Sequence, residues 1–437
     1  MDTSGSGQPV LVFNSLAHPR DTVVQLEYPE KSVHIHGPSH EEVPHQFITG
    51  HETGRRVLAF RAKKLPPIGF SVYRILDGPG QEKFPPVSVT PTTLENEHLK
   101  VTVNSSGEIV SLFDKTLNRT FFSAEKRGNV LKLYEDVPGK YEAWDIAPSY
   151  TKVEFEIPAG CAEVIEQGSV RSAIQITRPF RNSRLVQRIV LARGSRRIDF
   201  ETFVDWKEQQ KMLKVRFFTD IVTTKATYDI PFGTIERSAY RNNSFDAAKF
   251  EVAGHAWMDL SQGDCGLSLL NDCKYGFEAF DGMMCQTLLR GPLVPDPESD
   301  QEEHRFIYSI YPHAGDWRAG HTHRQALDLN HPPDAVLEAA HPGPLPPRHS
   351  FLQLDADNVF LEALKKAEKS DHLIIRLVER HGCGGPVSVN LAGLQIAEAF
   401  ECNLLEREDA PVEHNTSSFR FTIAPYQIRT FKIQPQL

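Results

Sequence analysis

Short segments in which apolar and polar residues alternate recur along the whole chain. Leu99, Val101 and Val103 alternate with polar residues, as expected of a half-buried β-strand. Similar segments follow at short intervals, and turn-forming residues separate them. They are residues 169–177, 185–191, 198–204, 213–218 and 306–311. Hardly any helical period lies between them, so the pattern predicts an all-β protein built from antiparallel β-sandwich domains.

Proline-rich segments divide this pattern into domains. Short strand-like pieces predict a small β domain over residues 1–78, followed by a proline-rich polar linker over 79–93. We expect a large β-sandwich over 94–330, a second proline-rich linker over 331–348 and a C-terminal small β domain over 349–437. In the last domain, the apolar residues and lysines of 359–369 fit a helix as well as a strand.

One stretch of the predicted sandwich concentrates polar residues between two apolar runs. The first run leads into a cluster that contains Asp272 and Lys274, and Gly276 allows a turn after it. The second run, 283–289, ends at Arg290. The simplest interpretation is a strand, a turn and a returning strand. It would place these charged residues at the ends of paired strands, where loops can build a site on a rigid sheet.

Composition and charge narrow the classes of function. The 437 residues are 40% hydrophobic and 24% charged, as in ordinary globular proteins. A net charge of -9 argues against a nucleic-acid partner, which requires a basic face. No stretch approaches the ~20 apolar residues of a membrane helix, and the N-terminus lacks the features of a signal peptide. We therefore expect a cytoplasmic protein with neither a nucleic-acid nor a membrane partner.

The cysteines and histidines offer few candidates for metal ligands. The six cysteines lie far apart without a CxxC pair, which favours buried thiols in a reducing compartment. His34 and His36 would share one face of a strand, and His321 and His323 have the same spacing. A polar exposed hairpin explains the first pair better, because no cysteine or fixed carboxylate pattern completes a ligand set. The sequence therefore predicts no metal site.

Two further polar stretches allow alternative interpretations. Trp144 and Asp145 combine an aromatic ring with a carboxylate, which carbohydrate sites use to pack on sugar C–H groups and to bind hydroxyls. Taken alone, a tryptophan in a β core explains the first of them better. The polar run 241–246 is either a loop that binds hydroxyl groups or a turn. No GxGxxG, GKS/T, HExxH or GxSxG motif supports a nucleotide-binding, zincin or serine-hydrolase function.

A series of short motifs in a fixed order carries a family resemblance. The motifs are VFNSL at 12–16, LENE at 94–97, YEAWDI at 141–146, VDWKE at 204–208, FGTIER at 232–237, FEVAGHAWMDLS at 250–261, LLNDCKYG at 269–276, LLER at 404–407 and APYQIRTF at 424–431. From Val10 to its end, the chain resembles the C-terminal β half of family 38 glycoside hydrolases, the class II α-mannosidases. It is most similar to their cytosolic-type branch, which acts on free oligomannosides.

The resemblance implies a fold, a substrate and a partner. It implies that the large sandwich resembles the galactose mutarotase-like supersandwich, and that 359–369 is a strand. Family members hydrolyse α-mannosidic bonds with retention, using a carboxylate nucleophile, a carboxylic acid/base and a zinc ion. The nucleophile and most zinc ligands lie in an N-terminal α/β domain, and no His-x-Asp zinc pair occurs here. We therefore expect no catalytic residue and no metal ligand in this chain, with the zinc held by an α/β catalytic domain or chain of the same enzyme.

The resemblance also assigns the candidate binding residues. In the family the large β domain lends an arginine to the rim of the zinc pocket, and Arg290 is the position that we match to it. The further candidates, as sugar contacts or as interface, are Asp272, Lys274, Tyr275, Trp144 and Asp145. At 238–240 the sequence SAY replaces the PTH of the branch, which removes any role for a histidine there.

Three functions follow as alternatives. The first is the C-terminal β portion of an α-mannosidase that removes α-linked mannose from oligosaccharides and is inactive without its zinc-bearing domain. The second is a stand-alone carbohydrate-binding or scaffolding module without hydrolase activity. The third is a degenerate fragment. A large uncovered apolar face on the sandwich would favour a missing partner domain.

Overall fold

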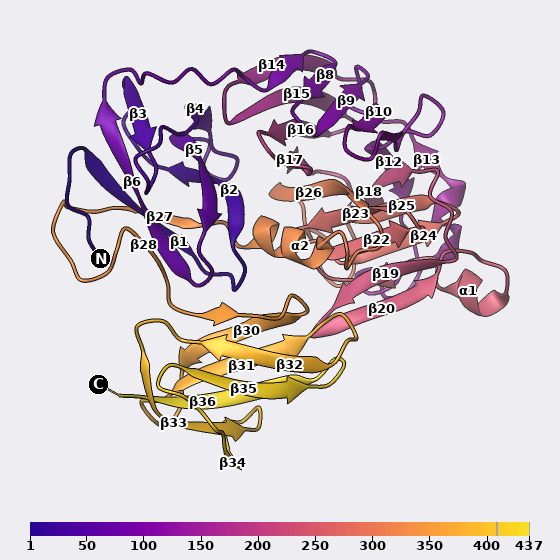
Figure 1. Cartoon of the computed structure of the whole chain (residues 1–437). Coiled ribbons are helices and arrows are strands. Elements are labelled where there is room, and N and C mark those ends of the chain that lie inside the picture. The colour runs from indigo at the N-terminus through magenta and orange to yellow at the C-terminus, as the bar shows by residue number, and fades with distance from the viewer. Residues whose placement is uncertain (408–409, 437) are drawn as a thin grey trace.

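The computed structural model describes residues 1–407 and 410–436, and its regular structure is almost entirely antiparallel β-sheet (Figure 1). The predicted all-β class is confirmed. Within the described residues the helices are α1 (Ser244–Ala248), α2 (Thr322–Asn330) and a 3-10 helix, η1 (Pro148–Lys152). None of them is both long enough and apolar enough to span a bilayer.

A nine-stranded and a six-stranded sheet form the large central sandwich. The nine-stranded sheet contains, in spatial order, β14 (Cys161–Gln167), β15 (Arg171–Phe180), β16 (Ser183–Ala192), β17 (Ile198–Asp205), β26 (Glu303–Ala314), β23 (Cys265–Asn271), β22 (Trp257–Ser261), β19 (Lys225–Ile230) and β20 (Gly233–Ser238). The six-stranded sheet contains β13 (Glu154–Phe155), β12 (Val130–Glu135), β18 (Lys211–Phe218), β25 (Met283–Arg290), β24 (Gly276–Phe280) and β21 (Val252–Ala253). A smaller sheet packs onto the same core with β11 (Arg119–Thr120), β10 (Ile109–Asp114), β9 (Leu99–Val103), β8 (Thr93–Glu95) and β7 (Ser88–Thr90).

Aromatic side chains join the two large sheets across the core. Phe200 on β17 and Phe217 on β18 are fully buried, and their ring centroids lie 6.0 Å apart. Tyr308 on β26 stacks on Phe200 with a centroid distance of 4.9 Å. Its hydroxyl donates to Asn129 Oδ1 at 2.6 Å and accepts from Gln187 Nε2 at 2.7 Å. The buried hydroxyl is therefore satisfied, and the centre of the sandwich is aromatic.

The N-terminal unit is a smaller sandwich with its own core. One sheet contains β27 (Asp334–Leu337), β1 (Gln8–Asn14), β6 (Gly69–Asp77), β28 (Arg348–Ser350) and β3 (Val33–His36). The other contains β2 (Arg20–Leu26), β5 (Arg56–Leu65) and β4 (His45–Thr49). Strand β27 and the first residue of β28 come from the segment expected as the second linker, and the rest of β28 comes from the start of the expected C-terminal domain. The chain therefore returns to the N-terminal unit before it enters the C-terminal one.

The C-terminal unit is also a two-sheet sandwich around one apolar cluster. Its larger sheet contains β30 (Val359–Lys366), β31 (Leu373–Glu379), β36 (Ile428–Gln436), β33 (Gln395–Cys402) and β34 (Ala410–Pro411), and its smaller sheet contains β29 (Gln353–Leu354), β32 (Gly385–Asn390) and β35 (Ser418–Ile423). Residues 359–366 form a strand, as the family resemblance favoured. Pairing of β30 with β31 overrides the helix-compatible composition.

The hairpin expected around residues 269–289 is wrong. Strand β23 is buried along its whole length and pairs with β22 and β26 in the nine-stranded sheet. The chain then crosses to the other sheet, where β25 pairs with β24 and β18. The tight turn lies at Asp281 and Gly282, whose φ values of 45° and 76° suit a two-residue hairpin loop. An apolar run identifies a buried strand, but it does not identify the sheet to which that strand belongs.

We expect Phe217→Ala to lower the free energy of unfolding by about 3–5 kcal/mol. The reason is that the substitution would leave a cavity where the two sheets contact each other. Urea unfolding followed by tryptophan fluorescence measures the change. Val222→Ala serves as the control, since Val222 is 76% exposed, and its effect should stay within about 0.5 kcal/mol. Equal effects of both substitutions would contradict the role of this cluster.

Candidate functional site

Arg290 lies at the end of β25 and is held by the segment that follows β12. Its Nε donates to Asp136 Oδ2 at 2.6 Å, and its Nη2 donates to the carbonyl oxygens of Glu142 and Asp145 at 2.9 and 2.7 Å. The side chain of Asp136 is 2% exposed and that of Arg290 is 17% exposed. Burial raises the pKa of Asp136, and the neighbouring guanidinium opposes the rise. The guanidinium is therefore fixed in place, with one side toward solvent.

Exposed apolar side chains lie on the same segment. Trp144 is 70% exposed and Tyr141 is 66% exposed, with their ring centroids 6.5 Å apart in an edge-to-face arrangement. The backbone N–H of Ala143 donates to the carbonyl of Val294, a residue that is itself 53% exposed. The interpretation of Trp144 as a core residue is wrong, because its segment covers the end of a sheet and presents the indole to solvent. We call Tyr141 and Trp144, together with the neighbouring Val294 from the segment after β25, the aromatic rim.

The six predicted site residues fall into two groups. Trp144, Asp145 and Arg290 meet on the segment just described, where the Asp145 carboxylate accepts the N–H of Ile146 at 2.9 Å. Asp272, Lys274 and Tyr275 lie on the crossing between the two large sheets, after β23 and before β24.

The crossing residues are bound to other parts of the sandwich. Asp272 Oδ2 accepts the backbone N–H of Ile307 at 2.8 Å. Lys274 Nζ lies 4.4 Å from the centre of the Phe306 ring. Tyr275 is 59% exposed. These contacts fix the crossing, so Asp272 and Lys274 have structural partners of their own.

A buried charge network lies near Arg290 on the six-stranded sheet, and sequence analysis did not identify it. Lys214 is fully buried on β18, and its Nζ donates to Glu251 at 2.6 Å, to Glu278 at 3.2 Å and to the Tyr150 hydroxyl at 3.0 Å. Burial favours the neutral amine, but the surrounding acidic groups outweigh it and hold the pKa of Lys214 well above its ordinary value. The sequence did hold one signal of this network, a lysine within a strand of mostly apolar residues, because a buried charge requires partners.

The polar run 241–246 belongs to the edge of this network. Arg241 Nη2 donates to Glu278 Oε1 at 2.6 Å. Asn243 Oδ1 accepts the N–H of Asp246 at 2.9 Å and caps α1. Of the two interpretations left open for the run, these contacts favour a structural turn.

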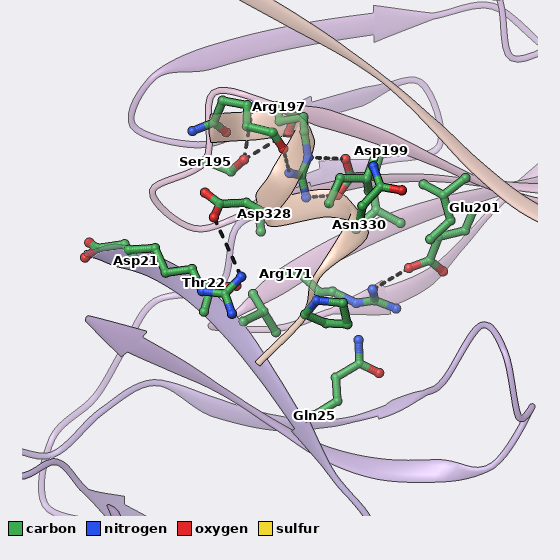
Figure 2. Close-up of a pocket in the computed structure, with 18 of the residues that line it drawn as sticks. Asp21, Thr22, Gln25, Arg171, Ser195, Arg197, Asp199, Glu201, Asp328 and Asn330 are labelled. Atoms are coloured by element: carbon green, nitrogen blue, oxygen red, sulfur yellow. Dashed lines mark hydrogen bonds and ion pairs between the residues drawn. The ribbon is translucent and has the colours of Figure 1, made fainter. Parts of the chain in front are cut away.

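A cavity of about 890 Å³ lies between β2 of the N-terminal unit, the nine-stranded sheet and α2 (Figure 2). Many charged side chains line it, together with apolar ones such as Val190 and Ile307. Its charged lining consists of Arg20, Arg61, Arg171, Arg196, Arg197, Arg324, Asp21, Glu27, Glu52, Asp199, Glu201, Asp272 and Asp328. Figure 2 shows Arg171 beside Glu201 and Arg197 beside Asp199, at Nη1–Oε1 and Nε–Oδ1 distances of 2.6 Å each.

Several polar atoms of this lining are buried without a hydrogen-bond partner. They include Nε and Nη2 of Arg20, Nε of Arg61 and Oδ1 of Asp272. Buried polar atoms require partners from water or from a ligand. The cavity therefore offers donors and an acceptor together, a combination that suits hydroxyl groups. Asp272 is the one predicted site residue that lines it.

The surroundings of Arg290 do not fit a zinc ion. Among residues 1–407 and 410–436, the one group of three potential ligands with adjacent donor atoms is His34, His36 and Glu42. His34 and His36 lie on β3 in the N-terminal unit, on the other side of the molecule from β25 in Figure 1.

Comparison with known proteins gives consistent matches over most of the chain. A profile described as "Glycosyl hydrolases family 38 C-terminal domain" matches residues 94–298, and one described as "Glycosyl hydrolases family 38 C-terminal beta sandwich domain" matches residues 358–431. The chain is 31% identical to alpha-mannosidase G of Dictyostelium discoideum over 426 residues, which cover 90% of this chain and 38% of that protein. It is 36% identical to human alpha-mannosidase 2C1 over 346 residues, which cover 77% of this chain and 33% of that protein.

The chain thus spans about a third of the length of these relatives. Among solved structures, an alpha-mannosidase from Enterococcus faecalis V583 superposes with a TM-score of 0.78 at 17% sequence identity. The match covers 99% of this chain and 57% of that one. At this identity the superposition establishes a shared fold over the whole described structure.

We expect Arg290→Ala to lower the free energy of unfolding by about 3–5 kcal/mol near pH 7.5, because it leaves the Asp136 carboxylate buried without its cation. Burial already raises the pKa of Asp136 above its ordinary value of 3.8, and removal of Arg290 raises it further. The folded variant then binds a proton more readily than the unfolded one, so the loss of stability should shrink as the pH falls through this raised pKa. Denaturant unfolding at several pH values measures it.

The double variant Arg290→Ala/Asp136→Asn provides the control. It removes the buried charge together with its partner, so it should recover much of the lost stability and lose the pH dependence. A loss that is the same at every pH, or that persists in the double variant, would contradict the ion pair as the cause.

Proposed function

The chain belongs to glycosyl hydrolase family 38, of which it carries the C-terminal β region, and from this premise we propose that it is the C-terminal β portion of an α-mannosidase. In this proposal the assembled enzyme hydrolyses α-linked mannose from oligosaccharides. The observation that carries the proposal is Arg290, held by Asp136 and two carbonyl oxygens beside an exposed aromatic rim.

Each part of this surface has a role in the proposal. The solvent side of the Arg290 guanidinium donates to a hydroxyl of the bound mannoside. Trp144 packs on a C–H face of the sugar, or contacts the catalytic domain together with Tyr141 and Val294. Exposed apolar side chains grouped in this way are typical of a surface that a partner covers. Asp145 orients Arg290 through its backbone carbonyl, so it acts as a positioning residue.

The partner in this proposal is an α/β catalytic domain or chain of the same enzyme. It supplies the carboxylate nucleophile, the acid/base and the zinc ion that holds sugar hydroxyls. We propose that the 437-residue chain is inactive without it. The lack of fit between a zinc ion and the residues around Arg290 supports this division.

We also propose a cytoplasmic location. Cys161, Cys265, Cys273, Cys285 and Cys383 are free thiols, as is usual in a reducing compartment. Of these, Cys161, Cys273 and Cys383 are exposed, so the expectation of uniformly buried thiols is wrong.

The activity of the purified chain on an aryl α-mannoside, with zinc added, tests the main proposal. We expect no hydrolysis by the chain alone and hydrolysis after mixing with an α/β catalytic segment of a family member. In the assembled enzyme, Arg290→Ala should lower kcat/KM by about 100-fold, the effect typical of one lost donor to a reacting substrate. Arg55→Ala is the control, because Arg55 is 72% exposed and pairs with a surface glutamate. Hydrolysis by the chain alone that is lost in Arg290→Ala would overturn the proposed division.

A second candidate function is a stand-alone carbohydrate-binding or scaffolding module. Two observations favour it: the exposed Trp144 and the cavity with unpartnered donors and an acceptor. Calorimetric titration of the chain alone with an oligomannoside separates the candidates. Binding that is lost in Trp144→Ala and kept in Phe245→Ala, a substitution at another exposed aromatic residue, would favour a module. Binding that is lost in Asp272→Asn would instead place the sugar in the cavity.

A further inference from the structure

Two histidines and a glutamate meet at one edge of the N-terminal unit. His34 and His36 occupy alternate positions on β3, so their rings lie on the same face of the strand with centroids 5.2 Å apart. The chain then turns back, and Glu42 forms an isolated β-bridge with His36. His36 Nε2 lies 3.9 Å from Glu42 Oε1. One ring nitrogen of each histidine and one carboxylate oxygen all lie within 4.8 Å of one another.

The hydrogen bonds behind these side chains orient them as metal ligands are usually oriented. His34 Nδ1 lies 3.0 Å from the carbonyl oxygen of Gly78, which places the proton on Nδ1 and leaves the lone pair on Nε2. The Glu42 carboxylate accepts the backbone N–H groups of Gln81 and Glu82 at 2.8 and 2.7 Å. Partners of this kind fix ligating histidines and carboxylates in metalloproteins.

The site is assembled from separate parts of the chain. The segment after β6 passes directly over it, and a Cβ at Gly80 would lie 2.7 Å from Glu42 Oε2 and 3.0 Å from His34 Cβ. A side chain at position 80 would therefore displace the Glu42 carboxylate from its present position. The side chains of His36 and Glu42 are 28% and 12% exposed. An ion can therefore enter from solvent and keep water in its remaining coordination positions.

We propose that His34, His36 and Glu42 bind one divalent transition-metal ion, with water completing the coordination. Two imidazoles and one carboxylate are the donor set that suits Zn²⁺. The three donor atoms lie within 4.8 Å of one another, and in this proposal the side chains rotate toward the ion as it binds. The bound ion would join β3, the turn after it and the segment that leads from β6 toward the large sandwich. Its role is to stabilise this junction.

Equilibrium dialysis of the whole chain against Zn²⁺ alone, with metal analysis of the retained protein, tests the proposal. We expect the wild type to retain one more ion per chain than His36→Ala or Glu42→Gln. Loss of a ligand should weaken binding by more than the roughly 10–100-fold that loss of an orienting partner causes. His40→Ala is the matched control, because His40 is an exposed histidine on the same turn, and it should bind as the wild type does.

Two further measurements keep the test decisive if a variant folds poorly. Melting of the wild type with Zn²⁺ and with a chelator should show stabilisation by the ion, because it binds the folded chain. X-ray absorption of the chain with one equivalent of zinc should show nitrogen and oxygen ligands that include two imidazoles. A sulfur shell from the exposed cysteines, or equal zinc retention by all four proteins, would overturn the proposal.

Discussion

The contact between the nine-stranded and the six-stranded sheet determines how the strand ends of the large sandwich lie relative to one another. Phe200 and Tyr308 from one sheet pack with Phe217 from the other, and the Tyr308 hydroxyl is satisfied inside the core. Because packed cores deform little, this contact fixes the relative positions of the strand ends. The end of β25, with Arg290, is thereby held against the segment that follows β12. The candidate site is thus a consequence of sheet packing.

The buried ion pairs contribute more to the specificity of this arrangement than to its stability. Arg290 with Asp136, and Lys214 with two glutamates, remove ions from water, and the desolvation of such pairs offsets much of their attraction. Each pair nevertheless penalises any arrangement in which one partner is buried alone. We infer that these pairs select a single position for the loops that cover the sheet. A guanidinium that must contact a sugar benefits from such a fixed position.

The N-terminal unit depends on distant parts of the chain in the same way. Strands β27 and β28 complete one of its sheets, and they follow β1 by more than 300 residues in the sequence. The chain therefore returns to this unit after it has formed the strands of the large sandwich. The cavity of Figure 2 lies where this unit contacts the sandwich and α2. The group of His34, His36 and Glu42 lies at another edge of the same unit. Both the cavity and this group of side chains therefore exist only where segments from different parts of the chain meet.

The sequence by itself determined the fold class, the family and Arg290 as a candidate, because alternating residues and ordered motifs are local signals. It also placed a strand at 359–366 once the resemblance was considered. Tertiary structure alone decided that Trp144 is exposed, that β23 and β25 belong to different sheets, and that Glu42 joins His34 and His36. Each of these facts depends on which distant segments meet. A periodic pattern shows that a strand has a buried face, but the partner that covers this face is chosen by packing of the whole chain.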